Sequence, residues 1–299
     1  MRAVLALVAL AVVACASSPV DPVGGTRPTY LETTTQEVPN AAALGRRIWT
    51  PSLDEGFVPQ GLTASGGFLF VSSYLPQPDL KSNTGPCRIF RIEAASGRAA
   101  GTIDIPPGMC THSGGLEHLG DGRLFLADTR RIFLIDVEKA LSAGRAQGAM
   151  KSLKLAGDLR GSYATFDGKD VWIGTWTKDA KDKARMYRLD PRVFDGEDDA
   201  TIDHTRALES IPVPLEAQGA VFDASGNIWI SASSGSFGIL YRLDRKGNVL
   251  ARHEMVAGLE DLAFDGRTLW GLSESGTRKY LNWPTRFPFI FEIDVARLK

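Results

Sequence analysis

The sequence lacks the short motifs that mark several large enzyme classes. It contains no G-x-S-x-G nucleophile elbow, no H-E-x-x-H zinc motif, no C-x-x-C pair, no G-x-G-x-x-G turn and no Walker loop. These motifs position, in turn, a serine nucleophile, a zinc ion, a redox dithiol, a dinucleotide and a nucleoside triphosphate. Acyl transfer by a triad, thiol redox chemistry and nucleotide hydrolysis by these routes therefore have no support.

An excess of charge of either sign is also missing. The 299 residues include 34 Lys and Arg against 35 Asp and Glu, which gives a formal net charge of −1. A chain with no positive field does not attract phosphate backbones, so a nucleic acid is not an expected partner. The 43% hydrophobic and 23% charged residues are typical of a globular protein, and we expect a monomer.

The N-terminal hydrophobic run is too short to span a membrane. It extends from Ala3 to Ala14 after Arg2 and would form about 18 Å of helix, less than the thickness of a bilayer core. This pattern is typical of a signal peptide, so residues 1–14 are predicted to be a leader and the protein to be exported.

The end of this run, Val12-Val13-Ala14-Cys15, resembles the bacterial lipobox, which implies that Cys15 is lipidated. Ordinary secretory cleavage after Ala16 is the alternative, because Ala14-Cys15-Ala16 also fits a small-x-small site. In the lipoprotein families that this motif resembles, Asp after the Cys tends to retain the protein at the inner membrane. The resemblance therefore implies, with Ala16 at this position, the periplasmic side of the outer membrane if the source is Gram-negative. We expect membrane contact through the lipid anchor only, a flexible tether over residues 15–43, and one domain over residues 44–299.

Cysteine is scarce, with three in the chain. If Cys15 carries lipid, Cys87 and Cys110 remain, and an exported pair is predicted to form a disulfide. Such a bond closes a loop of about 22 residues, worth roughly 3 kcal/mol in the chain-entropy model. Two buried free thiols are the alternative.

Five segments of the chain repeat one pattern, two short strands around a tight turn that contains glycine. Each second strand has an aromatic residue at the same place. The segments are GLTASGGFLFVSSY from Gly61, GLEHLGDGRLFLADT from Gly115, YATFDGKDVWIGTW from Tyr163, GAVFDASGNIWISAS from Gly219 and DLAFDGRTLWGLSE from Asp261. The turn residues are those that adopt positive φ in short hairpins.

A third strand follows each pair, as in RIFRIE from Arg88, and a fourth follows in the first four units. Four strands per unit, recurring about every 42 to 56 residues, predict an all-β, five-bladed β-propeller. The fifth unit lacks its last strand, and we expect residues 45–53 to supply it and close the ring. The acidic stretch from Pro191 to Arg206 is predicted to be a surface excursion and not part of a sixth blade.

The propeller geometry predicts a binding site at one mouth of the central channel. First strands begin and second strands end at this mouth, so side chains distant in sequence meet there. The loops from second to third strands differ in length and lie at the same mouth, where binding usually occurs. The candidate ligand-binding residues are Gln60, Tyr74, His112, Tyr163, Trp176, Gln218, Glu260, Asp261 and Glu274.

Several of these residues have alternative interpretations. Glu260 and Asp261 are suited to accept backbone N–H groups and water in the channel, or Glu260 to act as a base or to hold a hard cation. His112 is a candidate lining residue; a nucleophilic pair with Ser113 is disfavoured because adjacent strand residues point to opposite sides. His112 and Asp128 are the candidates for assisting proton transfer.

The segments FDASGNIWISAS, ILYRLDRKGNVL and EDLAFDGRTLWGLSE resemble the repeats of NHL-type and SMP-30/gluconolactonase-like propellers. In the second family the leading Glu of such a segment binds a divalent metal. The resemblance therefore implies that Glu260 is a metal ligand, with Ca²⁺ or another divalent cation as the possible cofactor.

Three functions follow as hypotheses. The first is an exported, lipid-anchored propeller of the cell envelope that binds a small molecule, glycan or peptide at the channel mouth. The second is a metal-assisted hydrolase of a lactone or ester, in which Glu260 holds the cation. The third is a structural scaffold without a ligand.

Overall fold

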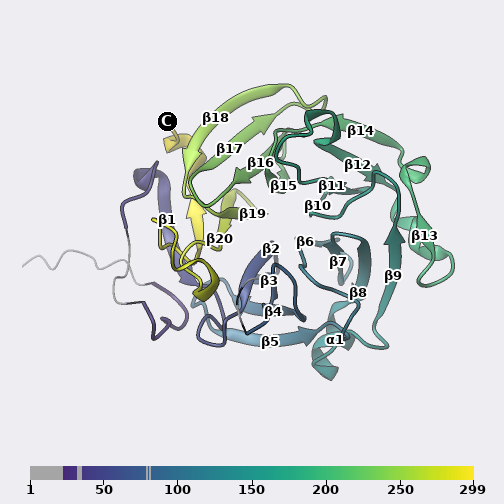
Figure 1. Ribbon diagram of the computed structural model, residues 1–299, viewed down its shortest axis with the longest axis horizontal. Helices are drawn as coiled ribbons and strands as arrows, with labels where there is room; N and C mark the ends of the chain where they lie inside the picture. Colours follow the sequence, from purple (N-terminus) through teal and green to yellow (C-terminus); the bar gives the residue numbers. More distant parts are fainter. Residues whose placement is uncertain (1–22, 32–35, 79, 81) are drawn as a thin grey trace, which may run out of the picture.

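The computed structural model describes residues 23–31, 36–78, 80 and 82–299. Five sheets radiate from a common axis, so the predicted five-bladed β-propeller is confirmed (Figure 1). The expected leader, Cys15 and residues 16–22 lie outside the described residues. Within the described part of the chain, no helix is both long and apolar enough to cross a membrane.

Each blade contains the four antiparallel strands that the repeats predict. Blade one has β2 (Val58–Ser65), β3 (Phe68–Tyr74), β4 (Cys87–Glu93) and β5 (Ala99–Asp104); blade two has β6 (Gly115–His118), β7 (Arg123–Asp128), β8 (Arg131–Asp136) and β9 (Met150–Leu155). Blade three has β10 (Tyr163–Phe166), β11 (Val171–Gly174), β12 (Arg185–Leu189) and β14 (Glu209–Pro212). Blade four has β15 (Ala217–Phe222), β16 (Ile228–Ser233), β17 (Gly238–Leu243) and β18 (Val249–Met255).

Blade five is completed from the other end of the chain. It contains β19 (Leu259–Asp265), β20 (Thr268–Ser273), β21 (Phe289–Ile293) and, as its outer strand, β1 (Leu44–Trp49). β1 runs antiparallel to β21, and Trp49 lies opposite Phe289 with ring centroids 4.3 Å apart. The predicted closure by an N-terminal strand is therefore confirmed.

Buried aromatic side chains explain why the second strands recur so regularly. Residues Phe70, Phe125, Trp172, Trp229 and Trp270 are all buried between blades. The turn aspartates of blades three and four also accept hydrogen bonds from two of these indoles, Asp167 from Trp172 and Asp223 from Trp229. Turn and core are thus coupled within the same hairpin.

The inner strands β2, β6, β10, β15 and β19 contact one another in a closed ring. Glycines allow this close approach, because a Cβ atom on Gly115 would lie 2.1 Å from the backbone nitrogen of Ala164. A Cβ atom on Gly219 would lie 2.3 Å from a carboxyl oxygen of Asp261. The centre of the ring is therefore filled, and open space remains at its mouth.

The described part of the expected tether lies against the propeller. Residues 23–31 and 36–43 place Leu31 and Val38 in the core of blade five. Tyr30 donates a hydrogen bond to the carbonyl of Gly276, and the main chain at Gly25 donates one to Ser96. The flexible tether expected over residues 15–43 therefore does not extend along this whole range, because Leu31 and Val38 are buried against the propeller.

The acidic excursion after β12 extends to the neighbouring blade. It contains β13 (Thr201–Ile202), which pairs in parallel with β9 of blade two. Asp198 accepts a hydrogen bond from the backbone nitrogen of Ser152, and Asp199 pairs with Lys154. The sequence pattern did not predict this link, nor helix α1 (Val137–Ala143), which Asp136 caps at its N-terminus.

The remaining elements are single turns of 3-10 helix. They are η1 (Ala41–Ala43), η2 (Lys181–Lys183), η3 (Pro191–Asp195), η4 (His204–Arg206), η5 (Arg278–Tyr280) and η6 (Val295–Arg297). Of these, η2 and η5 lie in loops between second and third strands, at the mouth where the site was expected.

Candidate functional site

A cavity of about 600 Å³ opens at the expected mouth of the channel. Six of the nine candidate residues line it: Gln60, His112, Trp176, Gln218, Glu260 and Glu274. They come from blades one, two, three, four and five, so the propeller brings together side chains that are far apart in sequence. The other three candidates, Tyr74, Tyr163 and Asp261, are fully buried outside this lining.

Three lining residues sit at irregularities of the inner strands. The register of pairing shifts at Gln60 in β2, at Gln218 in β15 and at Glu260 in β19. A bulge leaves one residue out of the ladder and turns its side chain in a new direction. The bulged residues of β2, β15 and β19 are therefore free to contribute their side chains to the mouth.

The floor of the cavity is a chain of hydrogen bonds across three blades. Gln60 Nε2 donates to Glu274 Oε2 at 2.8 Å, and Gln218 Nε2 donates to Glu260 Oε1 at 3.3 Å. The carboxyl groups of Glu260 and Glu274 are hydrogen-bonded to each other. Two carboxyl groups in direct contact must share a proton, because two ionised groups repel.

Burial controls the protonation of this pair. Desolvation raises the pKa of Glu274 to about 8, and it raises the pKa of Glu260 well above the usual range together with the neighbouring Glu274 charge. The pair therefore keeps at least one proton at neutral pH. A carboxyl group that is protonated near pH 7 is able both to donate and to accept a proton or a hydrogen bond.

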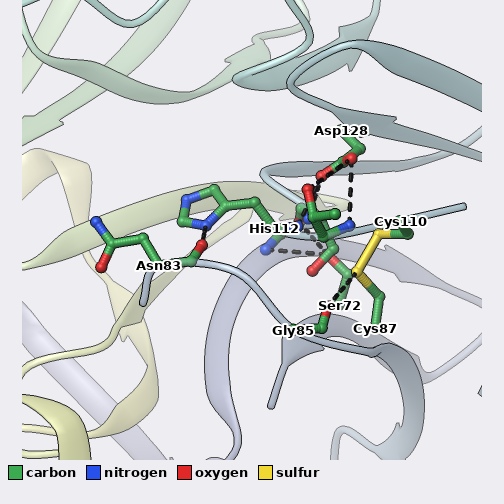
Figure 2. The surroundings of a disulfide bond; sticks show 10 residues. Ser72, Asn83, Gly85, Cys87, Cys110, His112 and Asp128 are labelled. Carbon is green, nitrogen blue, oxygen red and sulfur yellow. Dashed lines mark hydrogen bonds between the residues drawn. A yellow bond between two sulfur atoms is a disulfide. The ribbon is translucent and has the colours of Figure 1, made fainter. Parts of the chain in front are cut away.

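Aromatic side chains and His112 form the wall beside blade one. Tyr280 lines the cavity, and its ring stacks on Trp283 with centroids 4.1 Å apart. Behind it, the ring of Tyr74 lies 4.9 Å from that of His112, whose Nδ1 is 2.7 Å from the carbonyl oxygen of Asn83 (Figure 2). Burial lowers the pKa of His112, so a neutral ring is favoured.

The carboxylate of Asp128 is occupied by the main chain. It accepts hydrogen bonds from the backbone nitrogens of Thr111, His112 and Ser113 at 3.2, 2.7 and 3.0 Å, and from the Thr111 hydroxyl (Figure 2). These contacts hold the turn that carries His112 into the cavity. Asp128 is thus a positioning residue in this arrangement, although the sequence suggested it for proton transfer.

The predicted disulfide is confirmed and fixes the same corner. Cys87 and Cys110 are bonded, with Cα atoms 5.8 Å apart. Next to the bond, Gly85 donates from its backbone nitrogen to the carbonyl of Thr111, and Lys279 donates from Nζ to the carbonyls of Leu80 and Ser82. The long loops of blades one and five are therefore joined in one wall of the cavity.

Two of the fully buried candidates have structural surroundings. The ring of Tyr163 occupies the space over Gly174, where a Cβ atom would lie 1.9 Å from the ring. Asp261 accepts backbone hydrogen bonds from Leu62 at 2.8 Å and from Leu262 at 2.9 Å. Asp261 therefore joins the inner strands of blades five and one, which matches the alternative interpretation of this residue.

Apart from Trp176, the wall on the side of blade three was not recognised in the sequence. Thr175 and Arg185 lie at the end of β11 and the start of β12, Arg160 lies in the connection between β9 and β10, and Lys183 lies in η2. Second strands end at the mouth, so the sequence could have identified Thr175, which follows the last residue of β11 and directly precedes Trp176. The arginines carry no such signal, because charged residues are common in exposed loops.

A further buried carboxyl group lies on inner strand β6. Glu117 accepts hydrogen bonds from the hydroxyls of Thr63 at 2.7 Å and Thr165 at 3.5 Å. Burial raises its pKa to about 7. No sequence pattern singled out Glu117, because the equivalent repeat position is Thr in blades one and three.

The floor does not offer the set of oxygen ligands that the divalent cation implied by the resemblance would need. Both glutamines present their N–H₂ groups to the carboxyl pair, whereas a hard cation such as Ca²⁺ takes oxygen ligands. In the described residues no group of three or more His, Cys, Asp or Glu side chains is arranged to hold a metal. The floor as arranged fits a shared proton and does not fit a cation.

Comparisons with known proteins identify the architecture. No family model matches the chain, and no curated protein matches it in sequence. A solved glutaminyl cyclase from Myxococcus xanthus is 13% identical with a TM-score of 0.54, over 84% of this chain and 94% of that chain. A luciferin-regenerating enzyme is 12% identical with a TM-score of 0.43, over 88% of this chain and 96% of that one. The PQQ-bound aldose sugar dehydrogenase from Streptomyces coelicolor is 17% identical with a TM-score of 0.43, over 72% and 74%.

At 13% identity, the match to the glutaminyl cyclase shows the fold alone, and the two matches with a TM-score of 0.43 carry no argument. They assign no particular propeller family, and the SMP-30/gluconolactonase type remains a resemblance of repeats. The chain is a β-propeller.

Proposed function

We propose that this protein is exported, anchored by lipid at Cys15, and binds a small polar molecule, a glycan or a peptide at the mouth of its propeller. The observation that carries the proposal is the floor of the cavity, where Gln60, Glu274, Glu260 and Gln218 form one hydrogen-bonded chain. A structural carboxyl group such as that of Asp261 accepts hydrogen bonds from backbone N–H groups, whereas these four hydrogen-bonded side chains border the open space of the cavity.

The shape of the site supports binding. A volume of about 600 Å³ is within the range of pockets that enclose small ligands. The indole of Trp176 is 41% exposed at the rim, where it offers a face for stacking on a sugar or a side chain. The walls are long loops on a rigid ring, an arrangement in which loop sequence determines specificity.

Calorimetry on the full chain, expressed with its own leader and purified in detergent, tests the binding. A panel of mono- and disaccharides, short peptides and lactones is titrated into the wild type, Gln218→Ala and Trp176→Ala. Gln147→Ala is the matched control, since Gln147 is exposed outside this cavity. We expect a ligand whose affinity falls at least tenfold in the cavity variants only; equal affinity in all variants, or no ligand at all, contradicts the proposal and favours a scaffold.

Hydrolysis of a lactone or ester is the second candidate. It is favoured by the carboxyl pair, because a pKa near 8 at Glu274 suits a group that donates a proton at neutral pH. Turnover that survives a chelator and is lost in Glu260→Gln supports hydrolysis by the pair. Turnover that requires added Ca²⁺ supports the metal-assisted form, and no turnover removes both.

Export and lipid attachment rest on the leader and on Cys15, which lie outside the described residues. Labelled palmitate fed to expressing cells is expected to mark the wild type and not Cys15→Ser. Label that persists in Cys15→Ser contradicts the lipid anchor, while secretion of an unlabelled protein supports ordinary cleavage.

A further inference from the structure

The cavity has two chemically different walls, one with the carboxyl pair that shares a proton and one with an excess of cations. Glu260 and Glu274 belong to blade five, whereas Arg160, Lys183 and Arg185 line the side of blade three. Inner strands β19 and β10 lie across the central axis from each other (Figure 1). Asp158 and Asp182 line the same blade-three side. With three cations and two carboxylates, this side has one positive charge in excess.

The cations on this wall are not neutralised by close contacts. Among the described residues, Arg160, Lys183 and Arg185 take part in none of the ion pairs of the structure. Arg160 donates to the carbonyls of Gly157 and Leu159, and Arg185 donates to Ser210. Each guanidinium has five N–H donors, so both keep donors for a ligand.

A buried hydroxyl on the same wall lacks a partner. Thr175 is 9% exposed, lines the cavity, and its Oγ1 makes no hydrogen bond to any described residue. Its backbone nitrogen donates to the carbonyl of Arg185 at 3.0 Å, which fixes the residue beside that arginine. Leaving a buried hydroxyl unsatisfied is unfavourable, so an acceptor supplied by a ligand would be stabilising here.

We propose that the ligand is a short peptide with both ends free, whose carboxylate lies against Thr175, Arg160 and Arg185. Its ammonium group then lies against Glu260 and Glu274. This inference rests on the proposed binding function and names its ligand class. Guanidinium groups match a carboxylate in two-point hydrogen bonds, and a carboxyl pair accepts the N–H groups of an ammonium. The poles lie on opposite blades, and the cavity has the volume for about two or three residues.

The groups that face the carboxyl pair are consistent with this polarity. They are Gln60, Gln218, Ser233, Asp261, Lys279, Tyr74 and Tyr280. Lys279 is the one cation among them, and its ammonium group is bound to the carbonyls of Leu80 and Ser82. The remaining groups carry no positive charge, so the carboxyl oxygens of Glu260 and Glu274 are what a ligand ammonium meets at this end.

Titration of tripeptides into the full chain tests the proposal. The probes are Ala-Ala-Ala, its N-acetyl form, its C-terminal amide and maltose. We expect the free peptide to bind and each blocked form to bind at least tenfold more weakly, because one charged contact is lost. Equal binding of free and blocked peptides overturns the inference. Binding of maltose alone overturns it too, while leaving the proposed ligand site intact.

Two variants locate the carboxylate end. Thr175→Val removes the hydroxyl at nearly constant shape and is expected to weaken the free tripeptide about 3- to 10-fold while leaving the amide unaffected. Lys183→Gln removes a positive charge from the same wall and is expected to weaken the free tripeptide, whereas Lys181→Gln is not, because both residues belong to η2 and only Lys183 lines the cavity. Unchanged affinity in both Thr175→Val and Lys183→Gln overturns the assignment of this wall.

Discussion

Gln60 and Glu274 are 214 residues apart in sequence, and their side chains are joined by a hydrogen bond of 2.8 Å. Both residues are buried, and the bond crosses the seam where the first blade meets the last. Through Glu260 it continues to Gln218 on blade four. The floor of the mouth therefore forms only when blades one and five are in contact, that is, when the ring is closed.

The stability of the protein is predicted to fall as pH rises from about 5 to about 8. Burial raises the pKa of Glu274 from 4.5 to about 8, so in this interval the folded protein binds a proton that the unfolded chain has released. Glu117, with a pKa raised to about 7, acts in the same direction. We expect a loss of several kcal/mol in the free energy of unfolding, because each retained proton contributes about 1.4 kcal/mol per pH unit; the loss is measured in urea at pH 5 and pH 8.5.

Substitution of Glu274 measures its share of the pH dependence of stability separately from that of Glu117. Glu274→Gln is expected to reduce the loss between the two pH values, because the variant has no proton to release at this position. The exposed Glu197 provides the matched Glu→Gln control. An identical pH dependence in wild type and Glu274→Gln would show that the pair does not carry the linkage.

Asp128→Asn is predicted to destabilise the protein by about 1–3 kcal/mol. The amide replaces one acceptor oxygen with a donor that faces the backbone N–H groups of Thr111, His112 and Ser113. Urea unfolding measures the effect. Lost turnover at unchanged stability and unchanged binding would instead support the role in proton transfer that the sequence suggested.

Loss of the disulfide is predicted to cost about 3 kcal/mol, as the entropy of a loop of about 22 residues indicates. The double variant Cys87→Ser, Cys110→Ser is compared with the wild type in the presence and absence of reductant. The variant is expected to match the reduced wild type. Equal stability of oxidised and reduced protein would contradict the prediction.

The fold was predictable because its signal repeats. Each hairpin has glycine at its turn and an aromatic residue such as Trp229 in its second strand, so five weak local patterns support one another. The link of β13 to blade two was not predictable, since two residues pairing in parallel leave no periodicity. The docking of Leu31 and Val38 was missed for a similar reason, because single apolar residues in a polar segment show no pattern.

The candidate site was predictable in location and less so in composition. Topology alone places Gln60, Gln218 and Glu260 at one mouth, although their bulges are visible only in the structure. Which carboxyl groups face the cavity depends on side-chain direction. Glu260 faces the cavity, whereas the adjacent Asp261 accepts main-chain N–H groups, and no sequence rule distinguished these two.

Removal of β1 is predicted to open the ring. Two truncations are compared, one lacking residues 1–43 and one lacking residues 1–49, so that they differ only by Leu44–Trp49. The longer deletion exposes the edge of β21 and the ring of Phe289, which Trp49 covers. An unpaired, apolar edge strand recruits other chains, so we expect dimers or aggregates in size-exclusion chromatography together with a lower melting temperature.

A peptide of residues 44–52 added to the longer truncation tests the cause. If pairing with β21 is the missing interaction, the peptide is expected to restore a monomer-sized complex and to raise the melting temperature with its concentration, as ligand binding to the folded state requires. A scrambled peptide is the control. Restoration by both peptides, or a longer truncation as stable and monomeric as the shorter one, would mean that β1 covers blade five without closing it; the contacts of the inner strands, such as Gln60 with Glu274 and Leu62 with Asp261, would then hold the seam.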